Sequence, residues 1–299
     1  MPDLLARPLT GYELLDSGDG RKLERIAGVL VDRPAPPAIW RPAWKPERWA
    51  AATSKVERTK DGGGFWKHRG KEPQGLSLDW SPAPGRNLRF VLRLTSFGHC
   101  GLFFEQEAVW RLLHQLAGRL GRPAKALNLF GYTGAASLAM AAAGAEVYHV
   151  DSAKGVLTWG KESAAVSTLG TGSVRWVHED ALAFLAHSRK KGFRYDLILA
   201  DPPSWGHGAA DEVWRFDEHV QRLADDAVAV LSDDGVLLMS AHTPGVQHAA
   251  LGNVLSASGL PGVTSGEFAQ VHHQDPRRLP AGIFALGAKQ GDPAVWLAG

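Results

Sequence analysis

An acidic residue and two prolines directly follow a short apolar run near the middle of the chain. The run LILA at 197–200 is typical of a buried strand, and the motif DPPSW at 201–205 follows it. The prolines fix their own φ angles and favour extended geometry in the preceding residues, so the chain leaves the strand along a stiff path. Ligands of open α/β sheets bind at the carboxyl ends of strands. The motif therefore indicates either a carboxylate placed for ligand binding or a Pro-Pro turn with a capping Asp201.

A glycine turn follows an earlier apolar run, 125–130, in the sequence NLFGYTG. Gly131 and Gly134 allow a tight turn and let the backbone approach a ligand closely. The spacing G-x-x-G lacks the G-x-G-x-x-G pattern that holds a pyrophosphate. We therefore expect a nucleoside without phosphates here, because a nicotinamide or flavin dinucleotide fits poorly.

Two further acidic residues end the next two apolar runs. Asp151 ends the run 146–151, and a carboxylate in that place accepts hydrogen bonds from ribose hydroxyls. Asp180 ends the run 173–180, where it is placed to receive an adenine amino group. Either Asp alone is better explained as the N-cap of the following helix. Three such strand ends in order, followed by DPPSW, favour a nucleoside site over helix caps alone.

These motifs need strands that end on one edge of a sheet. From residue 105 the sequence alternates between helical and strand-like segments, which is typical of a parallel sheet with helices on both faces. We expect a doubly wound, mostly parallel, seven-stranded, Rossmann-like α/β domain over 105–299, after a small strand-rich domain over 1–104. The expected strands of the large domain are 125–130, 146–151, 173–180, 195–201, 235–242, 263–271 and 281–287, and the expected helices are 105–120, 134–144, 155–170, 181–192, 216–231 and 246–259.

Charge is distributed unevenly along the 299 residues, whose net charge is +2. Residues 33–71 contain ten Lys or Arg against three acidic residues. Basic side chains among aromatic rings suit a nucleic-acid strand, because cations meet phosphates while rings stack on bases. A solvated loop whose tryptophans pack on the main domain explains the same composition, so both interpretations stay open. The aromatic residues of this stretch are Trp40, Trp44, Trp49, Phe65 and Trp66.

The composition also argues against several classes of protein. A single cysteine, Cys100, rules out an intramolecular disulfide and a cysteine-rich metal site. His272 and His273 are adjacent and would point to opposite faces of a strand, so no metal site is expected. The chain has no segment typical of a secretory signal, and its longest apolar stretch, 135–145, is too short to span a bilayer. We expect a cytoplasmic protein without a membrane anchor, and we infer no obligate protein partner.

The ordered motifs LNLFGYTG, VYHVD, HED and DPPSW together resemble class I S-adenosylmethionine-dependent methyltransferases. More narrowly, they are similar to the group that contains the bacterial large-subunit ribosomal RNA methyltransferases, and TSFGHCGLFFEQ at 95–106 extends the similarity. The resemblance covers about residues 95–290 and depends on the combination of the motifs. It implies a methyltransferase with S-adenosyl-L-methionine as cofactor and RNA, preferably ribosomal RNA, as substrate.

The same resemblance implies roles in cofactor binding. Asp151 is expected at the ribose, while Asp180, followed by Ala181, is expected at the adenine. Phe103 and Gln106 would close one side of the pocket. The residues expected around the methionine part are Asn128, Phe130, Gly131, Thr133 and Gly134.

The DPPSW motif is expected to align the methyl acceptor beside the cofactor. The Asp201 carboxylate and the Pro202 carbonyl can accept the N–H groups of an exocyclic amine and orient its lone pair toward the methyl group. Pro203 helps to hold this turn rigid. Trp205 either stacks on a flipped-out base or belongs to the core.

The type of acceptor follows from what the chain lacks. Methylation of a pyrimidine C5 needs a cysteine nucleophile. In the family that this chain resembles, members with this activity carry the cysteine after the fifth core strand, where this chain has Ala241 and His242. Transfer to a base nitrogen is therefore preferred. Two alternatives stay open: the same chemistry on a protein side chain or small molecule, and a cofactor-binding RNA module without catalysis.

Overall fold

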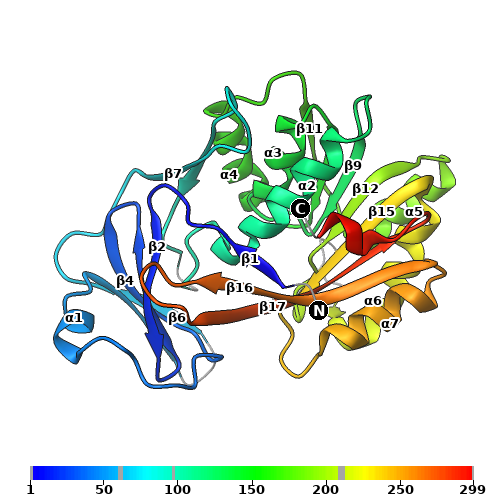
Figure 1. Cartoon of the computed structure of the whole chain (residues 1–299). Coiled ribbons are helices and arrows are strands. Elements are labelled where there is room, and N and C mark those ends of the chain that lie inside the picture. Colours follow the sequence, from blue (N-terminus) through cyan, green and yellow to red (C-terminus); the bar gives the residue numbers. More distant parts are fainter. Residues whose placement is uncertain (1–2, 60–62, 96–97, 208–212, 298–299) are drawn as a thin grey trace.

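The computed structural model describes residues 3–59, 63–95, 98–207 and 213–297 of the chain. Within these residues, an eight-stranded sheet covered by helices lies beside a smaller strand-rich part formed by the N-terminal residues (Figure 1). The expected α/β fold class is therefore confirmed. No helix of the described residues is long and apolar enough to cross a membrane.

The large sheet has the strand order β1-β16-β17-β15-β12-β9-β10-β11. The strands from β15 to β11 are parallel to one another, while β17 runs antiparallel between β15 and β16. The chain moves outward in one direction from β9 and in the other from β12, so a ligand site is expected at the carboxyl ends of these two strands. The strands are β1 (Leu4–Ala6), β9 (Lys125–Leu129), β10 (Glu146–Asp151), β11 (Ser173–His178), β12 (Tyr195–Ala200), β15 (Leu231–Ala241), β16 (Gly262–Val271) and β17 (Arg278–Ala288).

The central strand β12 shows how the sheet is buried on both faces. Leu197 and Leu199 pack into one core with residues of α2 and α3, whereas Ile198 and Ala200 pack into a second core with residues of α5, α6 and α7. A strand covered on both sides needs a continuous apolar run, which LILA provides. The helices of the large part are α2 (Glu107–Gly118), α3 (Ala135–Ala142), α4 (Lys154–Ala165), α5 (Ala181–Lys190), α6 (Phe216–Ala229) and α7 (His248–Ala257).

The N-terminal part consists of a five-stranded sheet in the order β2-β3-β4-β5-β6 and a separate two-stranded hairpin, β7-β8. The ring of Tyr12 stacks on Phe104 with 3.8 Å between centroids, which joins this part to the segment before α2. Its elements are β2 (Tyr12–Gly18), β3 (Arg21–Ile26), β4 (Val29–Pro34), α1 (Pro46–Ala50), β5 (Ser54–Arg58), β6 (Gly64–His68), β7 (Leu76–Trp80) and β8 (Leu88–Leu92). The described residues also contain two short 3₁₀ turns, η1 (Phe104–Gln106) and η2 (Pro293–Trp296).

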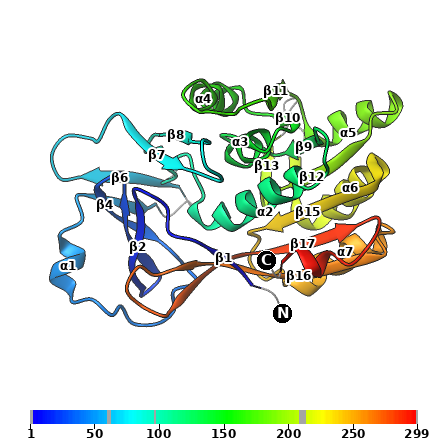
Figure 2. The same ribbon diagram turned by 45° about the horizontal axis from the view of Figure 1, so that its top comes forward.

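The described part of the large sheet has one strand more than the seven expected. The additional strand is β1, which comes from the N-terminal segment and pairs in parallel with β16. The β16–β17 hairpin in turn reaches the small sheet (Figure 2), where the His273 N–H donates to the Leu14 carbonyl at 2.9 Å. Backbone pairing therefore crosses between the two parts in both directions, and a domain boundary after residue 104 stays a prediction.

Candidate active site

A cavity that is open to solvent lies at the carboxyl ends of β9 and β12, with about 380 Å³ of empty space including the open solvent at its mouth. It is lined by residues of the glycine turn, of the segment before α2 and of the DPPSW motif. The predicted site residues that line it are Phe103, Gln106, Asn128, Phe130, Gly131, Thr133, Gly134 and Asp201. Those outside its lining are Asp151, Asp180, Ala181, Pro202, Pro203 and Trp205. Lining residues that the sequence did not single out include Gly101, Leu102 and Tyr132.

The turn between β9 and α3 is tightly folded. Phe130 and Tyr132 have φ angles of +57° and +51°, a left-handed conformation that costs roughly 1 kcal/mol or more per non-glycine residue. A Cβ on Gly131 would lie 2.3 Å from Cε1 of His149, so only glycine fits this close approach to β10. Gly134, at φ +86°, is the N-cap residue that precedes α3. The turn is thus held in a strained shape by its packing, as expected of a ligand-binding loop.

A buried polar chain lies beneath this turn. The Asn128 amide donates to Ser137 Oγ at 2.8 Å, and Ser137 Oγ lies 2.9 Å from His149 Nδ1. Burial lowers the pKa of His149 to about 3, so the imidazole that shares a hydrogen bond with the Ser137 hydroxyl is neutral at physiological pH. Asn128 Oδ1 is buried and has no hydrogen-bond partner in the described part of the chain. An unpaired acceptor in a cavity wall is available to a ligand.

Asp151 holds the same turn from the end of β10. Its carboxylate accepts hydrogen bonds from the backbone N–H of Tyr132 at 2.9 Å and of Ala153 at 2.8 Å. Burial raises the pKa of Asp151, and these two N–H groups offset part of the rise. The carboxylate therefore has a structural role in fixing the turn.

Asp180 is a helix cap. Its Oδ1 accepts from the backbone N–H groups of Leu182 at 2.9 Å and Ala183 at 3.0 Å, at the start of α5. Oδ2 accepts no hydrogen bond from any residue that the structure describes. Asp180 borders a second hollow, of about 770 Å³, that is also lined by Trp214 and Arg222. The helix cap therefore accounts for Oδ1 of Asp180 but leaves Oδ2 unexplained.

Asp201 is held by side chains from distant parts of the chain. The Gln106 amide, from η1, donates to Oδ2 at 2.9 Å, and the Ser240 hydroxyl, from the end of β15, donates to Oδ1 at 2.6 Å. Beyond Ser240, His242 places its Nε2 3.7 Å from Oδ1. These contacts fix both carboxylate oxygens at the cavity wall. Sequence reasoning missed Ser240 and His242, although they end a core strand at the same edge of the sheet.

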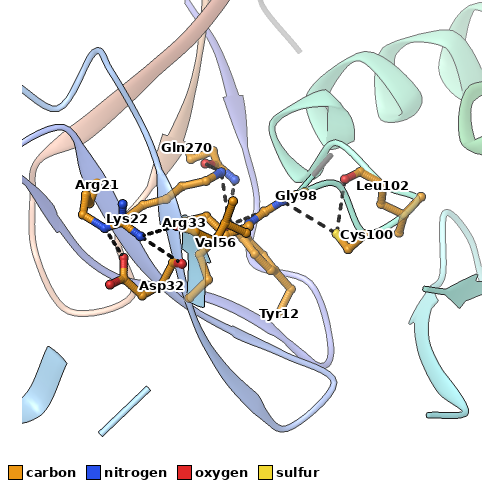
Figure 3. Close-up of polar contacts among 11 residues, drawn as sticks. Tyr12, Arg21, Lys22, Asp32, Arg33, Val56, Gly98, Cys100, Leu102 and Gln270 are labelled. Atoms are coloured by element: carbon orange, nitrogen blue, oxygen red, sulfur yellow. Dashed lines mark hydrogen bonds and ion pairs between the residues drawn. The ribbon is translucent and has the colours of Figure 1, made fainter. Parts of the chain in front are cut away.

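The N-terminal part supports another wall of the cavity. Arg33 is buried and donates from Nη1 to the Gly98 carbonyl at 3.4 Å, and the thiol of Cys100 donates to the Leu102 carbonyl at 3.6 Å (Figure 3). Glu24 binds Arg33 through two hydrogen bonds, of 2.7 and 2.9 Å. Burial alone would raise the pKa of Glu24, but the charges of Arg33 and Lys22 outweigh burial and lower the pKa to about 2. This buried ion pair anchors the segment that carries the lining residues Gly101, Leu102, Phe103 and Gln106.

The turn after Asp201 is fixed by a tryptophan that the sequence did not single out. Trp214 donates from Nε1 to the Pro203 carbonyl at 2.7 Å, and its ring packs on Phe130 with 5.0 Å between centroids. Trp205 is 57% exposed, so its interpretation as a core residue is wrong. It lies in a short hairpin, β13 (Trp205–His207) with β14 (Val213–Arg215), which was not expected from the sequence.

In the basic stretch at 33–71, three indoles are bound by other residues of the N-terminal part. The indole N–H groups of Trp40, Trp49 and Trp66 donate to Ser17, Asp16 and Thr95, so these hydrogen bonds stay within the N-terminal part instead of reaching the main domain as the packing interpretation expected. Phe65 is 48% exposed. The exposed basic side chains of this stretch are Arg41, Lys45, Arg48, Lys55, Arg58, Lys67, Arg69 and Lys71.

The adjacent histidines connect the two parts of the molecule. His272 lies with Nε2 2.8 Å from Ser17 Oγ, and His273 lies with Nε2 3.6 Å from Glu13 Oε1. Both contacts join the β16–β17 hairpin to β2. No group of three or more His, Cys, Asp or Glu that suits a metal ion occurs in the described ranges.

Comparison with known proteins identifies the family. A family profile described as S-adenosylmethionine-dependent methyltransferase matches residues 76–257. The SAM-dependent methyltransferase from Agrobacterium tumefaciens has a crystal structure that is 34% identical, with a TM-score of 0.87 over 96% of this chain and 93% of that one. A Streptococcus mutans protein assigned as a SAM-dependent methyltransferase is 18% identical with a TM-score of 0.68, over 94% of this chain and 76% of that one, and supports the fold alone.

A curated relative matches part of the chain. The ribosomal RNA large subunit methyltransferase K/L of Shewanella sp. (strain ANA-3) is 34% identical over 157 residues. The match covers 51% of this chain and 21% of the relative, so the matched region is about a fifth of that protein's length.

Proposed function

We propose a substrate and a mechanism for this chain, which belongs to the S-adenosylmethionine-dependent methyltransferase family. In the proposed reaction, a methyl group passes from S-adenosylmethionine to a nitrogen of an RNA base, with ribosomal RNA as the preferred substrate. The observation that carries this proposal is the Asp201 carboxylate, which is fixed at the wall of the cavity that also contains the glycine turn.

The chemistry of the cavity fits the cofactor. Asn128 Oδ1 is a buried acceptor without a partner in the described residues, which suits the ammonium group of the methionine part. We assign the ribose to Asp151 and the adenine to Asp180 and Ala181, whose Asp oxygen Oδ2 is not used by the helix cap. The remaining proposed contacts are Phe103, Gln106, Phe130, Gly131, Thr133, Gly134 and Asp201.

The DPP turn supplies acceptors for an amine. When bound, the cofactor supplies an electrophilic methyl group on a sulfonium. The exocyclic amine of a base is a weak nucleophile because its lone pair is delocalised into the ring, so orienting that lone pair is the main task. Asp201 and the Pro202 carbonyl accept the two N–H groups, and acceptors that are already fixed need no rearrangement during the reaction. The Pro202 carbonyl accepts no hydrogen bond from the residues that the structure describes.

The location of the cysteine supports nitrogen over carbon as the acceptor. Cys100 is fully buried and lies outside the cavity lining. Burial raises the pKa of its thiol, so the nucleophilic thiolate is disfavoured. C5 methylation of a pyrimidine, which needs that thiolate, has no suitable group here.

Surface charge supports RNA as the substrate. The exposed basic residues at 41–71 attract a phosphate backbone, and the exposed rings of Phe65 and Trp205 offer stacking surfaces worth about 1–3 kcal/mol per base. The relative named as a ribosomal RNA methyltransferase shares only a region with this chain, and we extend its substrate to this chain as a proposal. We assign substrate binding to residues 1–104 and catalysis to residues 105–299.

The proposal is tested by incubating the purified protein with S-adenosylmethionine that carries a tritiated methyl group and with total RNA from a strain that lacks the gene. We expect label in RNA with the wild type and loss of label with D201A, also when S-adenosylmethionine is saturating. Cofactor binding without RNA labelling by the wild type would contradict RNA as the substrate and favour a protein or small-molecule acceptor. Equal labelling by the D201A variant would remove Asp201 from the mechanism.

A further inference from the structure

We propose that His242 is a positioning residue that receives, through Asp201, the proton released from the methyl-accepting nitrogen. The inference rests on the proposed transfer to nitrogen. His242 follows β15, and its ring lies near Phe103 and Phe268 with centroid distances of 6.1 and 5.2 Å. The side chain of His242 is 33% exposed. The ring therefore borders both the cavity wall and solvent.

The hydrogen bonds of His242 define its tautomer. Nδ1 lies 2.8 Å from the carbonyl oxygen of Ala281, which can only accept, so Nδ1 carries the hydrogen. Nε2 of the neutral ring then has a lone pair. The Gln106 amide nitrogen, a donor, lies 3.3 Å from Nε2, which agrees with this assignment. The lone pair is thus directed to the side where Gln106 and Asp201 lie.

Gln106 couples the two acceptors. Its amide nitrogen has two hydrogens, and it lies 2.9 Å from Asp201 Oδ2 and 3.3 Å from His242 Nε2. His242 Nε2 is also 3.7 Å from Asp201 Oδ1. Protonation of Nε2 would exchange the long contact with Gln106 for an ion pair with Asp201. His242 Nε2 therefore accepts from Gln106 before the proton arrives and pairs with Asp201 after it.

The proton balance of the reaction calls for such a group. The lone pair of the amine forms the new nitrogen–carbon bond, and the electron pair of the broken carbon–sulfur bond remains on sulfur. The nitrogen then carries a positive charge and loses one proton to Asp201. A protonated Asp201 would be a donor and could not orient the next amine, so the proton must move on. We assign this step to His242 Nε2, which releases the proton to solvent.

The direction of the pH dependence follows. The groups that face the ring in the described structure are Asp201, the Gln106 amide, the rings of Phe103 and Phe268, and the Ala281 carbonyl, of which Asp201 alone is charged. An imidazolium cannot accept a proton. Turnover should therefore be low where His242 is protonated and should rise with pH as it becomes neutral.

The test compares H242Q with the wild type and with H273Q. His273 is a matched control, because it pairs with Glu13 at 3.6 Å on the β16–β17 hairpin, away from the cavity. Methyl transfer is measured between about pH 5 and 8. We expect turnover to rise with pH in the wild type and in H273Q. In H242Q we expect at least about a tenfold lower turnover and loss of the rising limb, with binding of S-adenosylhomocysteine retained.

A second measurement does not depend on activity. The ¹⁵N chemical shifts of labelled histidine, assigned to His242 with H242Q, should show a protonated Nδ1 and an unprotonated Nε2 in the neutral ring. The opposite tautomer would overturn the inference. If H242Q does not fold, H242A is tested with added imidazole, and turnover that does not recover would likewise overturn it.

The outcomes separate the inference from the function on which it rests. A wild type that binds S-adenosylhomocysteine but methylates no nitrogen acceptor would overturn the proposed function. A wild type that methylates RNA, together with an H242Q variant of equal turnover and equal pH profile, would overturn the role of His242 alone.

Discussion

Asp201 and Asp180 occupy equivalent places at the carboxyl edge of one sheet, but their hydrogen bonds have different origins. Asp180 accepts from backbone groups two and three residues further along the chain. Asp201 accepts from side chains that are 95 and 39 residues away. An Asp with local partners begins a helix, whereas an Asp with remote partners is fixed by the assembled fold. The second arrangement is typical of a preorganised reactive group.

The glycine turn, like Asp201, is held by contacts from another part of the chain. Gly131 closes against His149 on the neighbouring strand, and Asp151 binds the backbone of Tyr132 from the end of that strand. These contacts exist only after β9 and β10 have paired. Substitutions and pH should therefore distinguish contacts that shape the site from contacts that only stabilise a helix, with the larger effects at the site.

Substitution of Gly131 by alanine should have the largest effect. The new Cβ would lie 2.3 Å from the His149 ring, and overpacking of this kind costs roughly 1–3 kcal/mol. Because the turn lines the cavity, we expect loss of binding to S-adenosylhomocysteine, measured by calorimetry, and a lower melting temperature. The control is G118A, at the end of α2, where the backbone is helical and the added Cβ meets no atom within 4 Å. Unchanged ligand affinity in G131A would mean that the turn does not form the cofactor site.

Acid should destabilise the protein through His149. Burial lowers its pKa from 6.5 to about 3 in the folded state. The unfolded chain therefore takes up the proton first, and the stabilisation present above pH 6.5 is lost as the pH falls toward 3. At pH 5 this loss is about 2 kcal/mol. Urea unfolding is measured above pH 6.5 and at pH 5. The free energy of unfolding should decrease less between these conditions in H149Q than in the wild type. Equal decreases would mean that His149 does not cause the acid sensitivity.

Removal of one remote partner of Asp201 should slow the reaction without changing cofactor affinity. S240A deletes the hydrogen bond to Oδ1, which is 2.6 Å long. We expect turnover to fall about tenfold, equivalent to about 1.4 kcal/mol, because the carboxylate loses one of two fixed contacts. A kinetic comparison of kcat and KM for the cofactor measures this effect. A change confined to KM would place Ser240 with cofactor binding.

The smallest effect is expected at Asp180, where two variants separate cap from ligand contact. D180A removes the helix cap and should lower the free energy of unfolding by about 1 kcal/mol, while D180S retains the cap. Chemical denaturation of both variants measures this difference. If Oδ2 binds the adenine as we propose, both variants should bind S-adenosylhomocysteine more weakly than the wild type. If D180S binds S-adenosylhomocysteine with wild-type affinity, Asp180 acts only as a helix cap.

Much of the architecture follows from short-range patterns. The run LILA predicts a strand buried on both faces, and the alternation of strands and helices brings the ends of β9, β10, β11 and β12 to one edge. The glycine turn and Asp201 therefore came together as expected at one cavity. These predictions succeed because residues at strand ends are placed by the fold class itself.

Other features depend on contacts that no local pattern encodes. The three-residue strand β1 joins the large sheet only because β16 offers an edge. Trp40, Trp49 and Trp66 turn their indoles inward because backbone and carboxylate acceptors from distant segments face them. Ala241 and His242 were considered only as positions without a cysteine, and the relation of Ser240 and His242 to Asp201 appears once β15 lies beside β12.

In the proposed reaction, the Asp201 turn directs a methyl group to a base nitrogen of RNA. Mass spectrometry can identify the methylated nucleoside in RNA that was treated with a deuterated methyl donor by the wild type or by D201N. We expect one base-N-methylated nucleoside that carries the deuterated group and is absent after reaction with D201N. A deuterated group on a C5 carbon or a ribose oxygen, or an equal yield with D201N, would contradict the proposed reaction.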